Sequence, residues 1–134
     1  MTKDYKIKDS GKRRNFKTGS RRDMATGKGM PQLGSPIVEI ELYKHFEKGA
    51  LKYGERNWEK GQPLSEYIGS ARRHELKFRQ GLWDENHLIA YLWNVYCLVH
   101  TFYAVEMGIL PKELYDLPTY LPKKENKPKK EKKK

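Results

Sequence analysis

One stretch, residues 84–106 (DENHLIAYLWNVYCLVHTFYAVE), constrains the fold most, because it reads as a helix buried on most of its sides. Apart from its two ends it carries no formal charge if histidine is neutral. His87, Asn94 and Thr101 nevertheless recur every seven residues, which brings them near one face of a helix. Because an unpaired buried polar group is costly, another part of the molecule or a ligand must satisfy this polar stripe.

The excess of positive charge lies at the two ends of the chain. The length of 134 residues predicts one domain with a modest core, and the net charge is +11. Residues 1–28 carry +7 and residues 122–134 carry +6, whereas residues 29–121 carry −2. This distribution argues against nucleic-acid binding by residues 29–121 and confines any nucleic-acid contact to the basic ends.

Cysteine content and hydropathy predict a cytoplasmic protein. The single cysteine, Cys97, excludes an internal disulfide and is expected to be a buried thiol in a reducing compartment. No apolar run follows the basic N-terminal residues, so no signal peptide is expected. The stretch 84–106 is just long enough to cross a membrane, but polar residues interrupt it and acidic residues flank it. We therefore expect no membrane association.

A first helix is expected from Pro36 to about Tyr53. Ser35 is a suitable N-cap, proline is favoured in the first turn, and Gly54 is a suitable C-cap. Glu47 is expected on its inner face, so the carboxylate would point toward the core. The apolar residues expected on the same face are Ile40, Tyr43, Ala50 and Leu51.

Two further helices complete the expected fold. The second is expected from residue 66 to about 78, with Ser65 as N-cap and Gly81 after it, and the third begins with Asp84 as N-cap. Short connections predict an all-α antiparallel bundle, and a homodimer or higher homo-oligomer is expected to enclose the third helix. The expected organisation is a basic Gly-rich arm (1–35), a helical core (36–110), a docked segment (111–121) and a disordered Lys-rich tail (122–134).

The polar residues expected to point inward combine carboxylates with neutral nitrogen and oxygen donors. Such a set suits a hard divalent cation such as Mg²⁺ or Mn²⁺. The candidates are Glu47, His74, Asp84, Glu85, His87 and Asn94.

Simpler roles remain open for four of these candidates. Glu47 could pair with Arg72 or Arg73, and His74 could be a core histidine with its hydrogen bonds satisfied. Asp84 could act only as a helix cap, and Asn94 could hydrogen-bond between helices and fix their register.

The N-terminal arm interleaves glycine with lysine and arginine. That composition suits phosphate binding, through backbone N–H groups and guanidinium groups such as those of Arg14 and Arg22. No Walker A loop is present, and a flexible basic tail is the alternative interpretation.

Several motifs together resemble one known family. They are SGKRRNFKTGSRRDMATGKG, FEKGALKYGERNWEKGQPLSEYIGSARRH, DENHLIAYLWN and GILPKELYDLPTY, in this order between about Ser10 and Tyr120. They resemble a bacteriophage family of dATP/dGTP diphosphohydrolases, which is similar to the MazG-like all-α nucleotide pyrophosphohydrolases, including the MazZ enzymes. The resemblance implies a Mg²⁺- or Mn²⁺-dependent enzyme that converts dATP or dGTP to the monophosphate and pyrophosphate in phage nucleotide metabolism.

The resemblance also implies roles for particular residues. Catalytic and metal-binding roles fall on Glu47, Asp84, Glu85 and His87. Substrate binding falls on Arg14, Arg22, Lys28, Lys52, Asn57, Trp58, His74 and Asn94. The sequence departs from the family pattern at Met30 and Gln32, where a basic and an acidic residue are expected. It also lacks the plain ExxE and ExxD carboxylate set of MazG proteins, and Asp84 with His87 is the nearest equivalent.

Two functions without catalysis compete with this one. The first is a helical protein that binds nucleic acid through its basic ends. The second is a structural dimeric module in which the polar stripe is satisfied internally.

Overall fold

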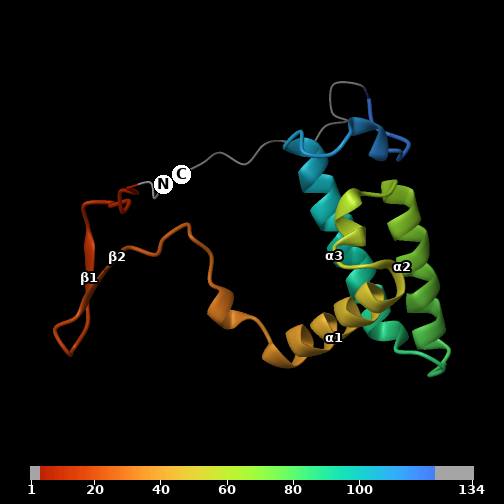
Figure 1. The fold of residues 1–134 in the computed structure, drawn as a ribbon, viewed down its shortest axis with the longest axis horizontal. Coiled ribbons are helices and arrows are strands. Elements are labelled where there is room, and N and C mark those ends of the chain that lie inside the picture. Colours follow the sequence, from red (N-terminus) through yellow and green to blue (C-terminus); the bar gives the residue numbers. More distant parts are fainter. Residues whose placement is uncertain (1–3, 123–134) are drawn as a thin grey trace. The chain divides into compact units, whose positions relative to one another are not determined.

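A computed structural model describes residues 4–122 of the chain, which divides into two units at Gly34 and Ser35. The unit before this boundary contains a small sheet, and the unit after it is helical (Figure 1). The all-α prediction for the body is confirmed. Nearly all of the predicted Lys-rich tail lies outside the described residues.

The first unit contains a β-hairpin. Strand β1 (Arg13–Asn15) pairs antiparallel with β2 (Arg21–Asp23), and a short 3-10 helix, η1 (Pro31–Leu33), follows. The carboxylate of Asp23 accepts a hydrogen bond from the backbone N–H of Ser10 at 3.1 Å, which fastens the residues before β1 to the end of β2. Composition alone favours disorder here, and the hairpin forms because pairing and side-chain contacts outweigh the low hydrophobicity.

Helix α1 (Pro36–Tyr53) has the bounds that its sequence predicts. The Oγ atom of Ser35 accepts a hydrogen bond from Val38 N at 3.3 Å and so caps the helix. At the other end, Gly54 N donates to Ala50 O at 2.8 Å, with a φ of 90° that favours glycine.

The predicted inner face of α1 is wrong. Leu42 is buried and His45, Phe46 and Gly49 are half-buried, whereas Ile40 and Leu51 are 55% and 85% exposed. Apolar side chains occur on both faces of this helix, so its sequence pattern does not decide which face packs on α3. Glu47 is consequently exposed rather than inward.

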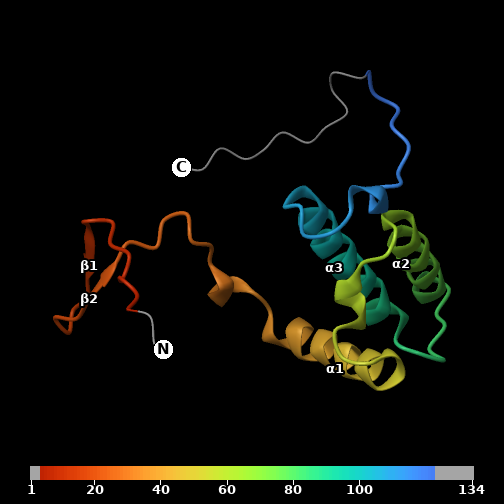
Figure 2. The same ribbon diagram turned by 45° about the horizontal axis from the view of Figure 1, so that its top comes forward.

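Helices α2 (Leu64–Arg79) and α3 (His87–Glu106) form an antiparallel pair, side by side in both Figure 1 and Figure 2. The buried stripe of α3 follows a spacing of three and four residues, and small side chains at Ala90 and Ala104 let the helices approach closely. The predicted polar stripe of His87, Asn94 and Thr101 is buried, with exposed fractions of 1%, 6% and 0%. The facing residues of α2 are Leu64, Tyr67 and Ala71.

The caps of α2 and α3 differ from those predicted. Helix α2 begins at Leu64 after Pro63, so Ser65 lies in its first turn and does not cap it. Helix α3 begins at His87, and the cap is Asn86, whose Oδ1 accepts from Ile89 N at 3.1 Å. Asp84 is therefore not an N-cap.

The segment after α3 reaches the start of α2. It contains the 3-10 helix η3 (Lys112–Leu114), and Asp116 Oδ1 accepts a hydrogen bond from Ser65 N at 2.9 Å. A carboxylate at a helix N-terminus is favourable because it accepts from an unpaired N–H and faces the positive end of the helix dipole. Asp116 thus supplies the capping acceptor that Pro63 cannot.

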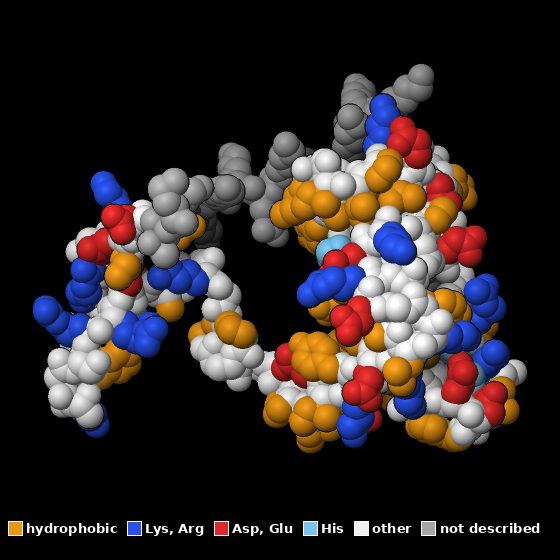
Figure 3. All heavy atoms as spheres, in the orientation of Figure 1, with side chains coloured by type: hydrophobic (Ala, Val, Ile, Leu, Met, Phe, Trp, Pro, Cys, Tyr) orange, Lys and Arg blue, Asp and Glu red, His pale blue; other side chains and the backbone are white. Residues whose placement is uncertain are grey.

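Helix α3 is long and apolar enough to cross a membrane by length and composition. Its buried polar stripe packs along α2, whereas Leu88, Val99 and Tyr103 on α3 are 45%, 49% and 56% exposed. Figure 3 shows uncovered hydrophobic side chains along α1, in the lower part of the helical unit. The homodimer that would cover such side chains stays a prediction.

Cys97 is expected to be unreactive in the folded protein. Its side chain is fully buried in α3, and burial raises the pKa of the thiol to about 12. At pH 8 the native protein should therefore react with a thiol reagent such as iodoacetamide far more slowly than the protein unfolded in guanidinium chloride, because the thiolate is the nucleophile. Equal labelling rates in the two states, followed by mass spectrometry, would contradict this burial.

Candidate functional site

The helical unit contains an open cleft of about 800 Å³. Its walls come from α1, from the 3-10 helix η2 (Asn57–Lys60), and from α2, α3 and the loop before α3. The volume lies within the range typical of small-molecule sites. Seven of the residues selected from the sequence line this cleft: Glu47, Lys52, Asn57, Trp58, His74, Glu85 and Asn94.

The charged side chains of the cleft balance each other. Three are basic, namely Lys48, Lys52 and Arg56, and three are acidic, namely Glu47, Glu55 and Glu85. A strongly anionic ligand such as a triphosphate would therefore need cations beyond those that the cleft itself supplies.

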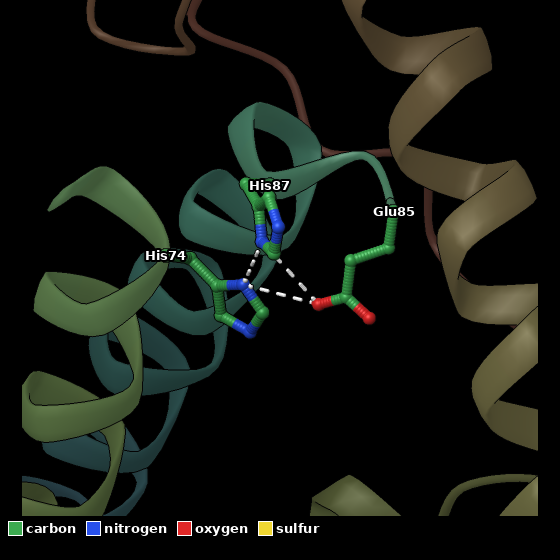
Figure 4. A group of neighbouring side chains, drawn as sticks. All are labelled: His74, Glu85 and His87. Carbon is green, nitrogen blue, oxygen red and sulfur yellow. Dashed lines mark hydrogen bonds and ion pairs between the residues drawn. The ribbon is translucent and has the colours of Figure 1, made fainter. Parts of the chain in front are cut away.

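Two histidines and one glutamate converge (Figure 4), and two of the three, His74 and Glu85, line the cleft. His74 comes from α2, His87 begins α3, and Glu85 comes from the loop between them. The Nδ1 atoms of the two histidines are 2.9 Å apart. Oε1 of Glu85 lies 3.3 Å from Nδ1 of His74 and 3.4 Å from Nδ1 of His87. The same three atoms could hold one cation.

Asp84 contacts the opposite side of the His87 ring. Its Oδ1 is 2.7 Å from Nε2 of His87, and this hydrogen bond lowers the pKa of the Asp84 carboxyl below its ordinary value. Burial lowers the pKa of His74, although the nearby Glu85 carboxylate opposes the shift. A neutral His74 has a nitrogen lone pair available at neutral pH.

Glu47 and Asn94 lie elsewhere on the cleft wall. Glu47 forms no ion pair with Arg72 or Arg73 among the described residues, and Arg72 instead lies 3.5 Å from Glu75. Asn94 donates its Nδ2–H to Ala90 O at 2.8 Å, within its own helix rather than between helices. Both residues line the cleft.

The comparison with known protein families decides the classification. Residues 18–107 match the model of the family described as dATP/dGTP diphosphohydrolase, N-terminal. This chain belongs to the dATP/dGTP diphosphohydrolase family. No curated protein and no solved structure matches the chain.

The matched region of this diphosphohydrolase family member contains the whole cleft from α1 to the first half of α3. It also contains Arg22 and Lys28 of the arm, whereas Arg14 precedes it. Met30 and Gln32, which depart from the expected family pattern, are both exposed at η1.

In the hairpin, Arg14 and Arg22 stand directly opposite each other. Residues opposite each other on paired strands project from the same face, and two like charges there destabilise the pair unless an anion neutralises them. Arg14 is also held in place, because its Nε donates to Asp23 O at 3.0 Å and its guanidinium lies 5.7 Å from the centre of the Phe16 ring. Lys28 is exposed.

Aromatic residues form a wall of the cleft that the sequence reasoning largely missed. Trp58 packs edge-on against Phe46 and His100, with ring centres 5.4 and 4.8 Å apart, and Phe46 also contacts Trp93. His45 lines the cleft as well, and burial lowers the pKa of its imidazole. The spacing of His45 and Phe46 from Leu42, three and four residues along α1, was the available signal.

Proposed function

We propose that this family member hydrolyses dATP or dGTP to the nucleoside monophosphate and pyrophosphate, with a divalent cation such as Mg²⁺ or Mn²⁺. The observation that carries the proposal is the convergence of His74 and Glu85, which line the 800 Å³ cleft, with the buried His87, in a chain of this family. Two nitrogen atoms and a carboxylate oxygen within 3.4 Å of one another form a donor set suited to a divalent cation.

The proposed chemistry needs a water molecule placed against the α-phosphorus atom, and no covalent intermediate. A bound metal ion would polarise the phosphate oxygens and acidify the water. Glu47, exposed on the facing helix of the cleft, would accept the proton of that water. Asn57 and Asn94 would donate hydrogen bonds that fix the orientation of the nucleotide.

Lysine and arginine side chains would bind the remaining phosphate charge. Lys52 lies in the cleft, with its Nζ 5.1 Å from the centre of the Tyr53 ring. The opposed pair of Arg14 and Arg22, together with Lys28, would give the hairpin unit its own capacity to bind phosphate oxygens through charge-assisted hydrogen bonds. The like charges of that arginine pair favour an anionic ligand over a passive basic tail.

Two aromatic side chains of the cleft are available to a purine base. Trp58 is half-buried within the aromatic wall, and Tyr53 is 62% exposed at its edge. Stacking of a base on such a ring contributes roughly 1–3 kcal/mol and tolerates different bases.

The proposal includes a homodimer or higher homo-oligomer in the cytoplasm of a phage-infected host, acting on the nucleotide pool.

The test is to incubate the full chain with each of the four dNTPs, with Mg²⁺ or Mn²⁺, and to separate the products by chromatography. Conversion of dATP or dGTP supports the proposal. A second arm measures binding to duplex DNA at increasing salt. Tight, salt-dependent DNA binding with all four dNTPs unchanged would instead favour the nucleic-acid-binding function.

A further inference from the structure

The three converging atoms form a nearly equilateral triangle. Its sides are 2.9, 3.3 and 3.4 Å, between Nδ1 of His74, Nδ1 of His87 and Oε1 of Glu85 (Figure 4). Ligands held about 2.1 Å from one ion are roughly 3.0 Å apart in octahedral geometry and roughly 3.4 Å apart in tetrahedral geometry. The observed sides span this interval, so the separations of the three atoms match those of ligands that share one ion.

The protonation of His87 is fixed by its other partner. Nε2 of His87 faces the Asp84 carboxylate at 2.7 Å, and a carboxylate accepts hydrogen bonds, so Nε2 carries the proton. In the neutral ring, Nδ1 then carries the lone pair, and Nδ1 is the His87 nitrogen that belongs to the triangle. Histidines that bind metals are commonly oriented in this way, by a carboxylate that accepts from the second ring nitrogen.

A shared proton could also hold the two Nδ1 atoms 2.9 Å apart. That arrangement needs one donor and one acceptor and gives no role to a third ligand. Glu85 nevertheless places an anionic oxygen almost equidistant from both nitrogens. The side chain of His87 is only 1% exposed, whereas those of His74 and Glu85 are 20% and 57% exposed. The triangle is thus anchored in the core and open toward the cleft.

We propose that His74, His87 and Glu85 bind one first-row transition-metal ion, such as Mn²⁺, Fe²⁺, Co²⁺ or Zn²⁺, in preference to Mg²⁺. Imidazole suits these ions, whereas Mg²⁺ prefers oxygen ligands. Asp84 is a positioning residue that fixes the His87 ring and is not itself a ligand. The catalytic use of this ion rests on the proposed function, since three protein ligands leave positions for water and phosphate oxygens.

The experiment measures metal binding by the full chain after removal of metals with EDTA. Co²⁺ is titrated while its visible absorption is followed, Mn²⁺ and Zn²⁺ are titrated by calorimetry, and excess Mg²⁺ is added as a competitor. Thermal unfolding provides a second readout, because an ion that binds only the folded state raises Tm. His74→Ala and Asp84→Asn are compared with the wild type, and His100→Ala is the control, because His100 is exposed and lies outside the triangle. His87 is left intact, since its burial makes a folding defect the expected result of its removal.

We expect Co²⁺ to bind the wild type and His100→Ala alike, without displacement by excess Mg²⁺. His74→Ala should lose most of this affinity, and Asp84→Asn should weaken it by about 10- to 100-fold while leaving the Tm of the metal-free protein unchanged. Unchanged Co²⁺ affinity in His74→Ala, or displacement by equimolar Mg²⁺, would overturn the proposal. Pyrophosphate release with Mg²⁺ and no Co²⁺ binding would reject this metal site and retain the proposed function. Co²⁺ binding without any nucleotide turnover would retain this metal site and reject the proposed function.

Discussion

Replacing Glu85 with glutamine is expected to lower the rate of pyrophosphate release from dATP or dGTP by about 100- to 1,000-fold. The substitution keeps the size of the side chain and removes the only carboxylate of the converging triangle. A metal ion contributes several kcal/mol of transition-state stabilisation, and about 1.4 kcal/mol corresponds to a factor of ten in rate. The measurement is the initial rate of pyrophosphate formation at saturating nucleotide and metal.

The matched control is Glu106→Gln, an exposed glutamate at the other end of α3. It removes the same charge from the same unit without touching the cleft, and its rate should stay within about twofold of the wild type. Thermal unfolding of both variants tests whether each is folded, since 57% exposure of the Glu85 side chain predicts little loss of stability. A Glu85→Gln protein that keeps the wild-type rate would remove the metal-binding account of the site.

Replacing Gly61 with alanine is expected to cause a large loss of stability. Gly61 has a φ of 89° and a ψ of 145°, which L-residues adopt only at a cost of roughly 1–3 kcal/mol. A Cβ atom there would also lie 2.8 Å from Cδ1 of Leu114 and 3.1 Å from Cδ1 of Leu110. Overpacking of this kind adds about 1–3 kcal/mol, although leucine side chains can partly move aside. Chemical denaturation measures the total.

Gly54→Ala separates the two contributions. Gly54 has nearly the same backbone conformation, with a φ of 90° and a ψ of 153°, but a Cβ atom there meets nothing within 4 Å. Gly61→Ala should therefore be the less stable variant, and combining it with Leu114→Ala should recover part of the difference. Equal losses in the two single variants would show that the contact with the segment after α3 contributes nothing.

Local signals in the sequence were sufficient to predict the bounds of α1 and the buried face of α3. Ser35, Pro36 and Gly54 act on the backbone within a few residues of themselves, so the bounds of α1 could be predicted. The seven-residue spacing of polar residues likewise identified the buried face of α3, because helix geometry alone brings them together.

Long-range contacts could not be predicted in the same way. The capping of α2 by Asp116 joins residues 51 positions apart. The cap of α3 lies in a run of three residues, Asp84, Glu85 and Asn86, and only the path of the loop decides which of them accepts from the first turn. The face that α1 packs on α3 was wrongly predicted because apolar residues occur on both of its faces.

For the candidate site too, local signals could be read from the sequence and long-range contacts could not. Periodicity selected His74 and His87 as inward-facing residues, but the 2.9 Å approach of their Nδ1 atoms depends on how α2 packs against α3. The role of Asp84 changed for a similar reason, because its carboxylate contacts Nε2 of His87 on the side of the ring away from the triangle. His45 was missed because the wrong face of α1 was predicted to pack on the core.

Phosphorus NMR of dGTP and dATP incubated with the full chain and Mn²⁺ tests the central claim most directly. The spectrum distinguishes pyrophosphate and a nucleoside monophosphate from a nucleoside diphosphate and inorganic phosphate. The account predicts equal amounts of monophosphate and pyrophosphate from at least one of the two nucleotides, and no such products from Glu85→Gln over the same time. Unchanged nucleotides with the metal-loaded protein, or a diphosphate and phosphate as products, would contradict it.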